Sequence, residues 1–241
     1  QPYLNNHEIL ERALQECENA HGANCEFYGA KMLGRSLTMW FRHTTPMITL
    51  TVDGITTAFY GGYYFTVQET SGNAMRGTPA IFSTHGVCLA SFQQFGARAT
   101  RNQFGEQFTV RLAQLFSKVF DAKFERDLLC TGIQSLPETS LGYLSAMLSD
   151  AREKRTEYMI KVLRSYGVQK DLATAILEDV LYKGHDSPDV PNMQQLSILF
   201  SRRSLFDLLV CLLRTARLRR AAVRERLELL AYRILVGRVT F

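Results

Sequence analysis

Apolar residues recur at three- and four-residue spacing through most of the second half of the chain, and this periodicity constrains the fold most strongly. An aromatic-rich stripe opens the region: Phe104, Phe108, Leu112, Leu115, Phe116, Val119 and Phe120. A helix is predicted over 140–166, because Gly167 follows it as a typical C-terminal glycine. Another is predicted over 169–182, and the segment 192–236 should form one long helix or two in sequence. These elements together predict a helical bundle.

The N-terminal half mixes helical and strand signals. Residues 7–20 show helical spacing, and a second helix is predicted over about 25–41. β-Branched and aromatic residues then dominate 47–67. Asp53-Gly54 is a strong hairpin signal, because a type I′ turn needs positive φ at both central positions. A second turn is predicted at Gly61-Gly62, which gives an antiparallel meander with strands at about 48–52, 55–60 and 63–68.

These elements predict a mainly α fold with a minor β part, in which a helical domain carries a small three-stranded antiparallel meander near residues 47–68. The length of 241 residues is close to the size at which single cores stop growing. No linker-like stretch marks a boundary, so one integrated domain over 1–241 is predicted. Two subdomains, a helix with the meander over 1–100 and a helical bundle over 101–241, are the alternative.

Charge is distributed unevenly along the chain. The whole sequence has 28 basic and 23 acidic residues, whereas 196–241 carries ten arginines and three acidic residues. Such a local excess suggests an acidic partner, with nucleic acid as the first choice. A solvated helix face, or pairing with the acidic middle segment, would explain the excess equally well. No run of about 18 apolar residues occurs, so we expect no membrane span.

Leucine and arginine alternate within the C-terminal segment. The leucine stripe is too broad to be spare, so it should face the core. Arginines at three- and four-residue spacing would share one face of a helix. Their planar, permanently charged guanidinium groups suit phosphate. The predicted nucleic-acid contacts are Arg202, Arg203, Arg214, Arg217, Arg219, Arg220, Arg224 and Arg226.

Five cysteines are an odd number for a chain of this length, which favours free thiols in a reducing compartment, the cytoplasm or the nucleus. Cys17, His21 and Cys25 are good zinc ligands by type. On an unbroken helix the two cysteines would lie about 12 Å apart, too far for one metal. Gly22 offers a break that would let Cys25 fold back.

Two interpretations of these residues follow. The first is a zinc site formed by Cys17, His21 and Cys25, with a distant fourth ligand. The candidates for that ligand are His85, Cys88 and Cys130. The second is a half-buried helix face with two free cysteines and a polar histidine.

Catalytic signatures are absent from the sequence. It contains no phosphate-binding glycine loop, no HExxH, no GxSxG and no EF-hand loop. A cysteine nucleophile at Cys88 with His85 as its base is conceivable on type alone, but free cysteine is among the most buried residues. We therefore expect a protein that is not an enzyme.

The sequence thus favours a nucleic-acid-associated binding or regulatory protein, RNA rather than DNA, that uses the basic C-terminal helix face. Tyr60, Tyr63 and Tyr64 would add base stacking, although strand packing explains them too. The alternative is an interaction or assembly subunit of a larger complex or of a viral particle, without direct nucleic-acid binding. A protein partner or a homo-oligomer fits either function.

Overall fold

The structure is a computed structural model of the chain. It describes residues 6–34, 36–52, 54–68, 74–89, 95–98, 110, 113–114, 132–141, 152–182, 202–237 and 239. The chain divides into two compact units. Unit 1 consists of Gln1–Thr51, Ile55–Thr84 and Leu89–Asp127, and unit 2 of Val52–Gly54, His85–Cys88 and Leu128–Phe241. One integrated domain stays a prediction.

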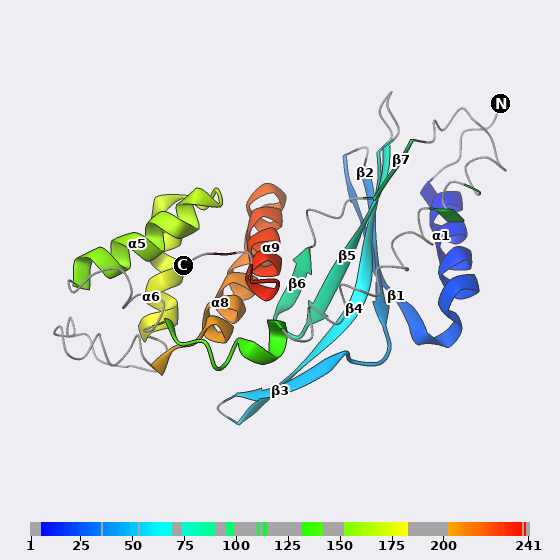
Figure 1. Cartoon of the computed structure of the whole chain (residues 1–241). Helices are drawn as coiled ribbons and strands as arrows, with labels where there is room; N and C mark the ends of the chain where they lie inside the picture. Colours follow the sequence, from blue (N-terminus) through cyan, green and yellow to red (C-terminus); the bar gives the residue numbers. More distant parts are fainter. Residues whose placement is uncertain are drawn as a thin grey trace. The chain divides into compact units, whose positions relative to one another are not determined.

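In unit 1 a helix packs on an antiparallel sheet (Figure 1). Helix α1 (Asn6–His21) confirms the first predicted helix, and the 3₁₀ turn η1 (Gly22–Asn24) follows it. The strands are β1 (Cys25–Leu33), β2 (Ser36–His43), β3 (Ile48–Val52), β4 (Ile55–Gln68), β5 (Ala74–Ser83) and β7 (Phe95–Arg98). The order in the sheet is β1-β2-β4-β5, with β3 paired to β4 and β7 paired to β5.

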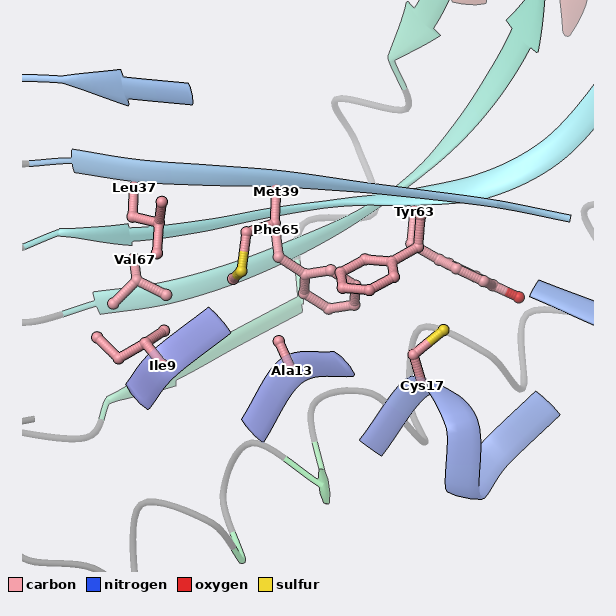
Figure 2. Close-up of a cluster of buried hydrophobic side chains, with 9 residues drawn as sticks. Ile9, Ala13, Cys17, Leu37, Met39, Tyr63, Phe65 and Val67 are labelled. Atoms are coloured by element: carbon pink, nitrogen blue, oxygen red, sulfur yellow. The ribbon is translucent and has the colours of Figure 1, made fainter. Parts of the chain in front are cut away.

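The core of unit 1 lies between α1 and one face of the sheet. Residues four apart on α1 share the side that faces the strands, and alternate residues of β2 and β4 meet them. Cross-strand partners such as Met39 and Phe65 lie directly opposite each other. The buried cluster consists of Ile9, Ala13, Cys17, Leu37, Met39, Phe41, Tyr63, Phe65 and Val67 (Figure 2).

The predicted fold class is wrong, because the sheet of unit 1 is far larger than a three-stranded meander. The segment predicted as a second helix over 25–41 forms the antiparallel pair β1 and β2. Gly34 between them has a φ of +59°, a left-handed conformation that glycine adopts readily. Packing of Leu37, Met39 and Phe41 against α1 stabilises the strand, so tertiary contact outweighs weak helical spacing.

The two glycine signals near the meander have different outcomes. The Asp53-Gly54 hairpin is confirmed, since β3 and β4 flank it and Gly54 has a φ of +76°. The predicted turn at Gly61-Gly62 is wrong, because β4 runs through both residues. A Cβ at Gly62 would lie 2.2 Å from the Phe41 carbonyl oxygen and 2.5 Å from the Phe82 ring. Glycine is therefore needed there for close approach of neighbouring strands.

Unit 2 is helical in most of its described part. It contains α5 (Arg152–Ser165), α6 (Lys170–Tyr182), α8 (Leu205–Arg217) and α9 (Ala221–Leu235), and the short strand β6 (Gly86–Leu89) lies largely within it. Helix α6 packs on α5 and α8, and α8 packs on α9. The leucine stripe faces the core as expected: Leu208, Leu209, Leu212, Leu213, Leu227, Leu230 and Leu235 are buried.

The helical predictions for this half have mixed outcomes. Helix α6 confirms the prediction over 169–182, and α5 covers the second part of 140–166. Within the described part of 192–236, which begins at residue 202, α8 and α9 are two separate helices. The residues of the aromatic stripe that begins at Phe104 lie outside the described residues. No described helix is long and apolar enough to cross a membrane.

Candidate nucleic-acid interface

Two consecutive helices of unit 2 position most of the arginines predicted to contact nucleic acid. Helix α8 begins with a capping box, in which the Ser204 N–H donates to Asp207 Oδ2 over 2.9 Å. It ends at Arg217, and the N–H of its C-cap Leu218 donates to the Thr215 carbonyl over 3.1 Å. Three residues separate the two helices, and α9 begins at Ala221 with Arg220 as its N-cap. The chain therefore turns between α8 (orange) and α9 (red) without a glycine or proline (Figure 1).

Six predicted arginines gather around this turn. We call this set the arginine-rich turn: Arg214, Arg217, Arg219, Arg220, Arg224 and Arg226. All except the half-buried Arg224 are exposed. The sequence predicted one shared helix face, whereas the arginines come from the last turn of α8, the connection and the first turns of α9. The helix break concentrates them around one connection instead of spreading them along a continuous axis.

Arg202 and Arg203 do not belong to the arginine-rich turn. They precede α8, so the length of that 13-residue helix, about 20 Å, separates them from its C-terminal end. Arg202 is exposed and Arg203 is half-buried. The Arg203 carbonyl accepts a hydrogen bond from the Leu141 N–H over 2.8 Å. These two residues therefore do not extend the cluster.

Arg224 and Arg226 of the arginine-rich turn make internal hydrogen bonds. Arg224 Nε donates to Glu228 Oε1 over 2.7 Å, and the Glu228 side chain is buried. Burial raises the pKa of the Glu228 carboxyl, while the hydrogen bond and charge of Arg224 oppose the rise. Arg226 donates to the Gly167 carbonyl over 3.3 Å. These contacts orient part of the cluster and reduce its freedom to meet a ligand.

The start of α9 adds to the positive field of the turn, while the last carbonyl groups of α8 oppose it. Helix α9 has no acidic residue in its first turn, and its N-cap Arg220 makes no side-chain capping hydrogen bond. The N-terminal end of a helix carries unpaired N–H groups and a partial positive charge. Arg219 and Arg220 lie beside that end. An anion at the turn would therefore meet guanidinium groups and backbone N–H groups together.

Leu218 is a candidate contact that sequence reasoning missed. Its side chain is 86% exposed at the connection, between Arg217 and Arg219. The signal was present in the sequence, because Leu218 is out of phase with the stripe that includes Leu212 and Ala216. An apolar side chain among arginines can contact a base or an apolar patch on a protein partner.

The zinc candidates are partly brought together. Helix α1 ends at His21, Gly22 has a φ of +55°, and β1 begins at Cys25. Cys25 is half-buried and packs against the core cluster that contains Cys17. The His21 side chain and the whole of Cys130 lie outside the described residues. Over the described ranges, no group of three His, Cys, Asp or Glu side chains is placed to hold a metal ion.

His85 and Cys88, proposed as further ligands or as a catalytic pair, belong to unit 2. Cys88 is fully buried, and burial together with the negative charge of Glu228 raises the pKa of its thiol. The thiolate is the nucleophile and the metal ligand, so both roles require a form that this environment disfavours. His85 is half-buried at the start of this segment. The structure thus offers no support for chemistry at Cys88.

The three tyrosines predicted to stack on bases lie on opposite faces of the sheet. Tyr63 is buried in the core under α1, and its hydroxyl is 2.9 Å from His43 Nε2. Tyr60 and Tyr64 are half-buried on the other face. The Arg42 guanidinium lies 4.7 Å from the Tyr60 ring centre, and Tyr64 packs edge-on against Trp40. Tyr63 is therefore not available for stacking.

Together these observations define a protein with one helix-on-sheet unit and one helical unit that carries an arginine-rich turn. Comparison of the chain with models of protein families, with curated proteins and with solved structures finds no match. Its function is therefore inferred from the geometry and chemistry of its own residues.

Proposed function

We propose that this protein is a non-enzymatic, nucleic-acid-associated binding or regulatory protein that contacts phosphates with the arginine-rich turn. One observation carries the proposal: five of its guanidinium groups are exposed around a single connection, and no acidic residue occurs from Arg214 through Arg224. Arginine binds phosphate through two parallel, charge-assisted hydrogen bonds. Each phosphate that is neutralised also releases counterions, which makes binding favourable at low salt.

RNA is the preferred ligand over DNA. Sequence-specific readers of B-DNA commonly lay an exposed helix in the major groove. Helix α8 buries most of its residues, and α9 buries most of those from Leu227 onward. A protruding connection with arginines and one leucine suits the phosphates and unstacked bases of a single strand better than a groove.

The test measures binding of a labelled single-stranded RNA by fluorescence anisotropy at several salt concentrations. The variant Arg214→Glu/Arg219→Glu/Arg220→Glu reverses three exposed charges and leaves the Arg224–Glu228 pair intact. We expect its affinity to fall by roughly 100-fold, with a shallower dependence on salt. DNA of the same sequence should bind more weakly than the RNA.

A matched control reverses three exposed charges that do not belong to the arginine-rich turn: Lys31→Glu/Arg76→Glu/Lys161→Glu. Its affinity should fall by less than about threefold, because charges that do not contact the RNA act only through a field that salt screens. Equal losses of RNA affinity in the two triple variants would show that only net charge matters, which would refute a role for the turn. Wild-type affinity that does not change with salt would refute phosphate binding altogether.

Leu218 supports a second candidate function, an interaction or assembly subunit of a larger complex or of a viral particle. An apolar side chain that is 86% exposed within a basic rim fits an apolar pocket edged by acidic residues. A homo-oligomer or a separate protein partner could present such a pocket. Light scattering of the wild type over a range of concentrations distinguishes self-association from a monomer.

Zinc binding by Cys17, His21 and Cys25 is a separate proposal. The bend at Gly22 supports it, because Cys25 after the bend packs against the core cluster that contains Cys17. Elemental analysis of purified protein should find zinc that is lost in Cys25→Ser, and a metal content near zero in the wild type would refute it.

Free thiols favour a reducing compartment, the cytoplasm or the nucleus. Microscopy of the tagged chain in cells tests this localisation.

A further inference from the structure

Strand β1 lies at one end of the sheet order and exposes large hydrophobic side chains. Among the described strands it pairs with β2 alone. Phe27, Tyr28 and Met32 are 40%, 51% and 46% exposed. The strand residues buried beneath α1 belong to β2 and β4, so the helix leaves β1 accessible. A nine-residue strand edge with such side chains is a site at which another strand can pair.

Phe27 and Ala30 of β1 share the sheet face that packs on α1. They lie opposite Phe41 and Met39, which are buried in the core beneath α1, and residues directly opposite in an antiparallel pair share a face. A regular strand could not place both on one face, since side chains alternate and these two residues are three apart. The register against β2 shifts between Phe27 and Gly29, which inserts one extra residue into β1. This bulge brings Phe27 and Ala30 to the same face.

The other residues at the centre of β1 lie on the outer face, which is the face of the sheet away from α1. Glu26 and Lys31 are opposite residues of β2 that alternate with those facing α1. Tyr28 is on the outer face too, because its ring lies 4.6 Å from the Arg42 guanidinium that also pairs with Glu26. Over residues 26–31 the order of faces is therefore outer, helix side, outer, outer, helix side, outer. This order is the same when it is read backwards.

This symmetry allows β1 to pair in antiparallel orientation with β1 of a second copy of the chain. A two-fold axis between Tyr28 and Gly29 places Glu26 opposite Lys31 of the second copy, and Phe27 opposite its Ala30. Each pair joins residues of the same face, as pairing of two strands in one sheet requires. A register shifted by one residue would place side chains of opposite faces against each other. The one register with matching faces is thus also the one in which opposite charges meet twice.

We propose that β1 is a self-association surface, at which two copies of this chain join their sheets by antiparallel pairing of residues 26–31. The pairing satisfies edge N–H and C=O groups of both copies and covers the exposed Phe27 rings. A second copy is the occupant because it brings the same order of faces together with the complementary charges at Glu26 and Lys31. The surface belongs to unit 1, whereas Leu218 and the arginine-rich turn belong to unit 2. The inference therefore does not rest on RNA binding.

The experiment measures the dimer dissociation constant of the full-length protein by sedimentation equilibrium. Lys31→Glu places two carboxylates opposite each other at both ends of the pairing, so the dissociation constant should rise by roughly 10-fold or more. Glu26→Lys places two ammonium groups there and should have a similar effect. An equimolar mixture of the two variants should form a heterodimer, because each lysine then meets a glutamate. The matched control Arg76→Glu makes the same charge reversal at an exposed residue of β5 and should dimerise like the wild type.

A second measurement needs no variant. Amide hydrogen exchange over residues 26–31 of the wild type should slow as the protein concentration rises, because pairing protects the edge N–H groups. Exchange that does not depend on concentration, or a monomer at every concentration, would overturn the proposal and show that the bulge keeps this edge from pairing. Equal dimerisation of Lys31→Glu and Arg76→Glu would also overturn it.

RNA binding is measured separately from self-association. A short RNA that occupies one arginine-rich turn should bind Lys31→Glu within about threefold of the wild type, because Lys31 lies outside the turn and acts only through a screened field. Loss of RNA binding in the charge-reversed turn would leave the dimer of the wild type unchanged. A dimer that is lost in Leu218→Ser but kept in Lys31→Glu would assign self-association to the turn and overturn the role of β1.

Discussion

The cores of unit 1 and unit 2 consist of different kinds of side chains. In unit 1 aromatic rings meet at defined angles, with Phe41 and Phe65 edge-on at a centroid distance of 5.9 Å. Two strands also approach closely at Gly62, where a Cβ has no room. In unit 2 the core is largely aliphatic, and leucines of α8 and α9 such as Leu208, Leu212 and Leu227 are fully buried in it. Leucine side chains can pack in several arrangements of similar volume, whereas aromatic ring geometry and close backbone contact allow few.

The candidate chemistry follows the same division. In unit 1 the zinc candidates Cys17 and Cys25 lie near the end of α1 and at the start of β1, where Cys17 is itself part of the core. In unit 2 the arginine-rich turn lies at helix ends, beyond the buried leucines. Substitutions at the turn should therefore change binding with little effect on folding. Substitutions in the sheet core should change folding first.

The largest expected effect tests close strand contact in unit 1. Gly62→Ala places a Cβ against the Phe41 carbonyl and the Phe82 ring, so the free energy of unfolding should fall by about 3 kcal/mol or more. Chemical denaturation followed by circular dichroism measures it. Gly61→Ala is the matched control, because its Cβ meets the flexible Met47 side chain at 3.1 Å, and it should cost less than about 1 kcal/mol. Equal costs at the two glycines would show that strand geometry, not contact, sets the requirement.

A smaller effect concerns the ion pair behind the arginine-rich turn. Arg224→Gln leaves the buried Glu228 carboxylate without its cation. A fully buried pair would lose several kcal/mol, but the Arg224 side chain is 36% exposed, so solvent screening reduces the expected loss to about 1–2 kcal/mol. Unfolding at neutral pH measures the loss. A wild-type value in Arg224→Gln would mean that the pair stabilises nothing.

The same carboxyl predicts a pH dependence with a definite sign. Burial raises the folded-state pKa of Glu228 above the ordinary glutamate value of 4.5, so the folded state holds its proton more tightly than the unfolded state. Its contribution to stability is therefore full below pH 4.5 and is lost as pH rises through the folded pKa. Glu228→Gln should remove this part of the dependence, and Arg224→Gln should extend it to higher pH. Denaturation midpoints from about pH 4 to about pH 8 compare the three proteins, and identical profiles would contradict the assignment.

The smallest expected effect on folding is at the exposed connection of unit 2. Leu218→Ser should change the free energy of unfolding by less than about 0.5 kcal/mol, because the side chain buries little. If the turn contacts RNA mainly through phosphates, affinity should fall by less than about threefold. If it docks on a protein, the mass measured by light scattering or the retention of that partner should change. A loss of stability above about 1 kcal/mol would mean that Leu218 is packed in solution.

Local signals predicted several features correctly, and each had a local physical cause. The α1 helix follows from its apolar spacing, and the hairpin at Gly54 follows from the positive φ that glycine accepts. The leucine stripe of α8 and α9 predicted its own burial, because helical periodicity repeats over many residues. The concentration of arginines after residue 200 is likewise a property of the sequence itself.

The failures share a different cause. Residues 25–41 carry weak helical spacing, and α1 with β4 provides the contacts that make them strands. Gly62 resembles a turn residue in the sequence, because its reason for being glycine is a carbonyl on another strand. No glycine or proline occurs at the break between α8 and α9. Gly34 is a local signal of the turn between β1 and β2, but nothing local marks Gly62 or the break after α8.

What the sequence determined by itself was therefore the inventory: helical stripes, one tight hairpin, free cysteines and a basic C-terminal segment. Tertiary structure decided which residues share a neighbourhood. It extended the sheet beyond a meander, packed Cys25 against the core that contains Cys17 and gathered six arginines around one connection. The physical reason is that spacing along a chain records local backbone preference, whereas contacts between distant segments depend on burial and close approach, which no local window contains.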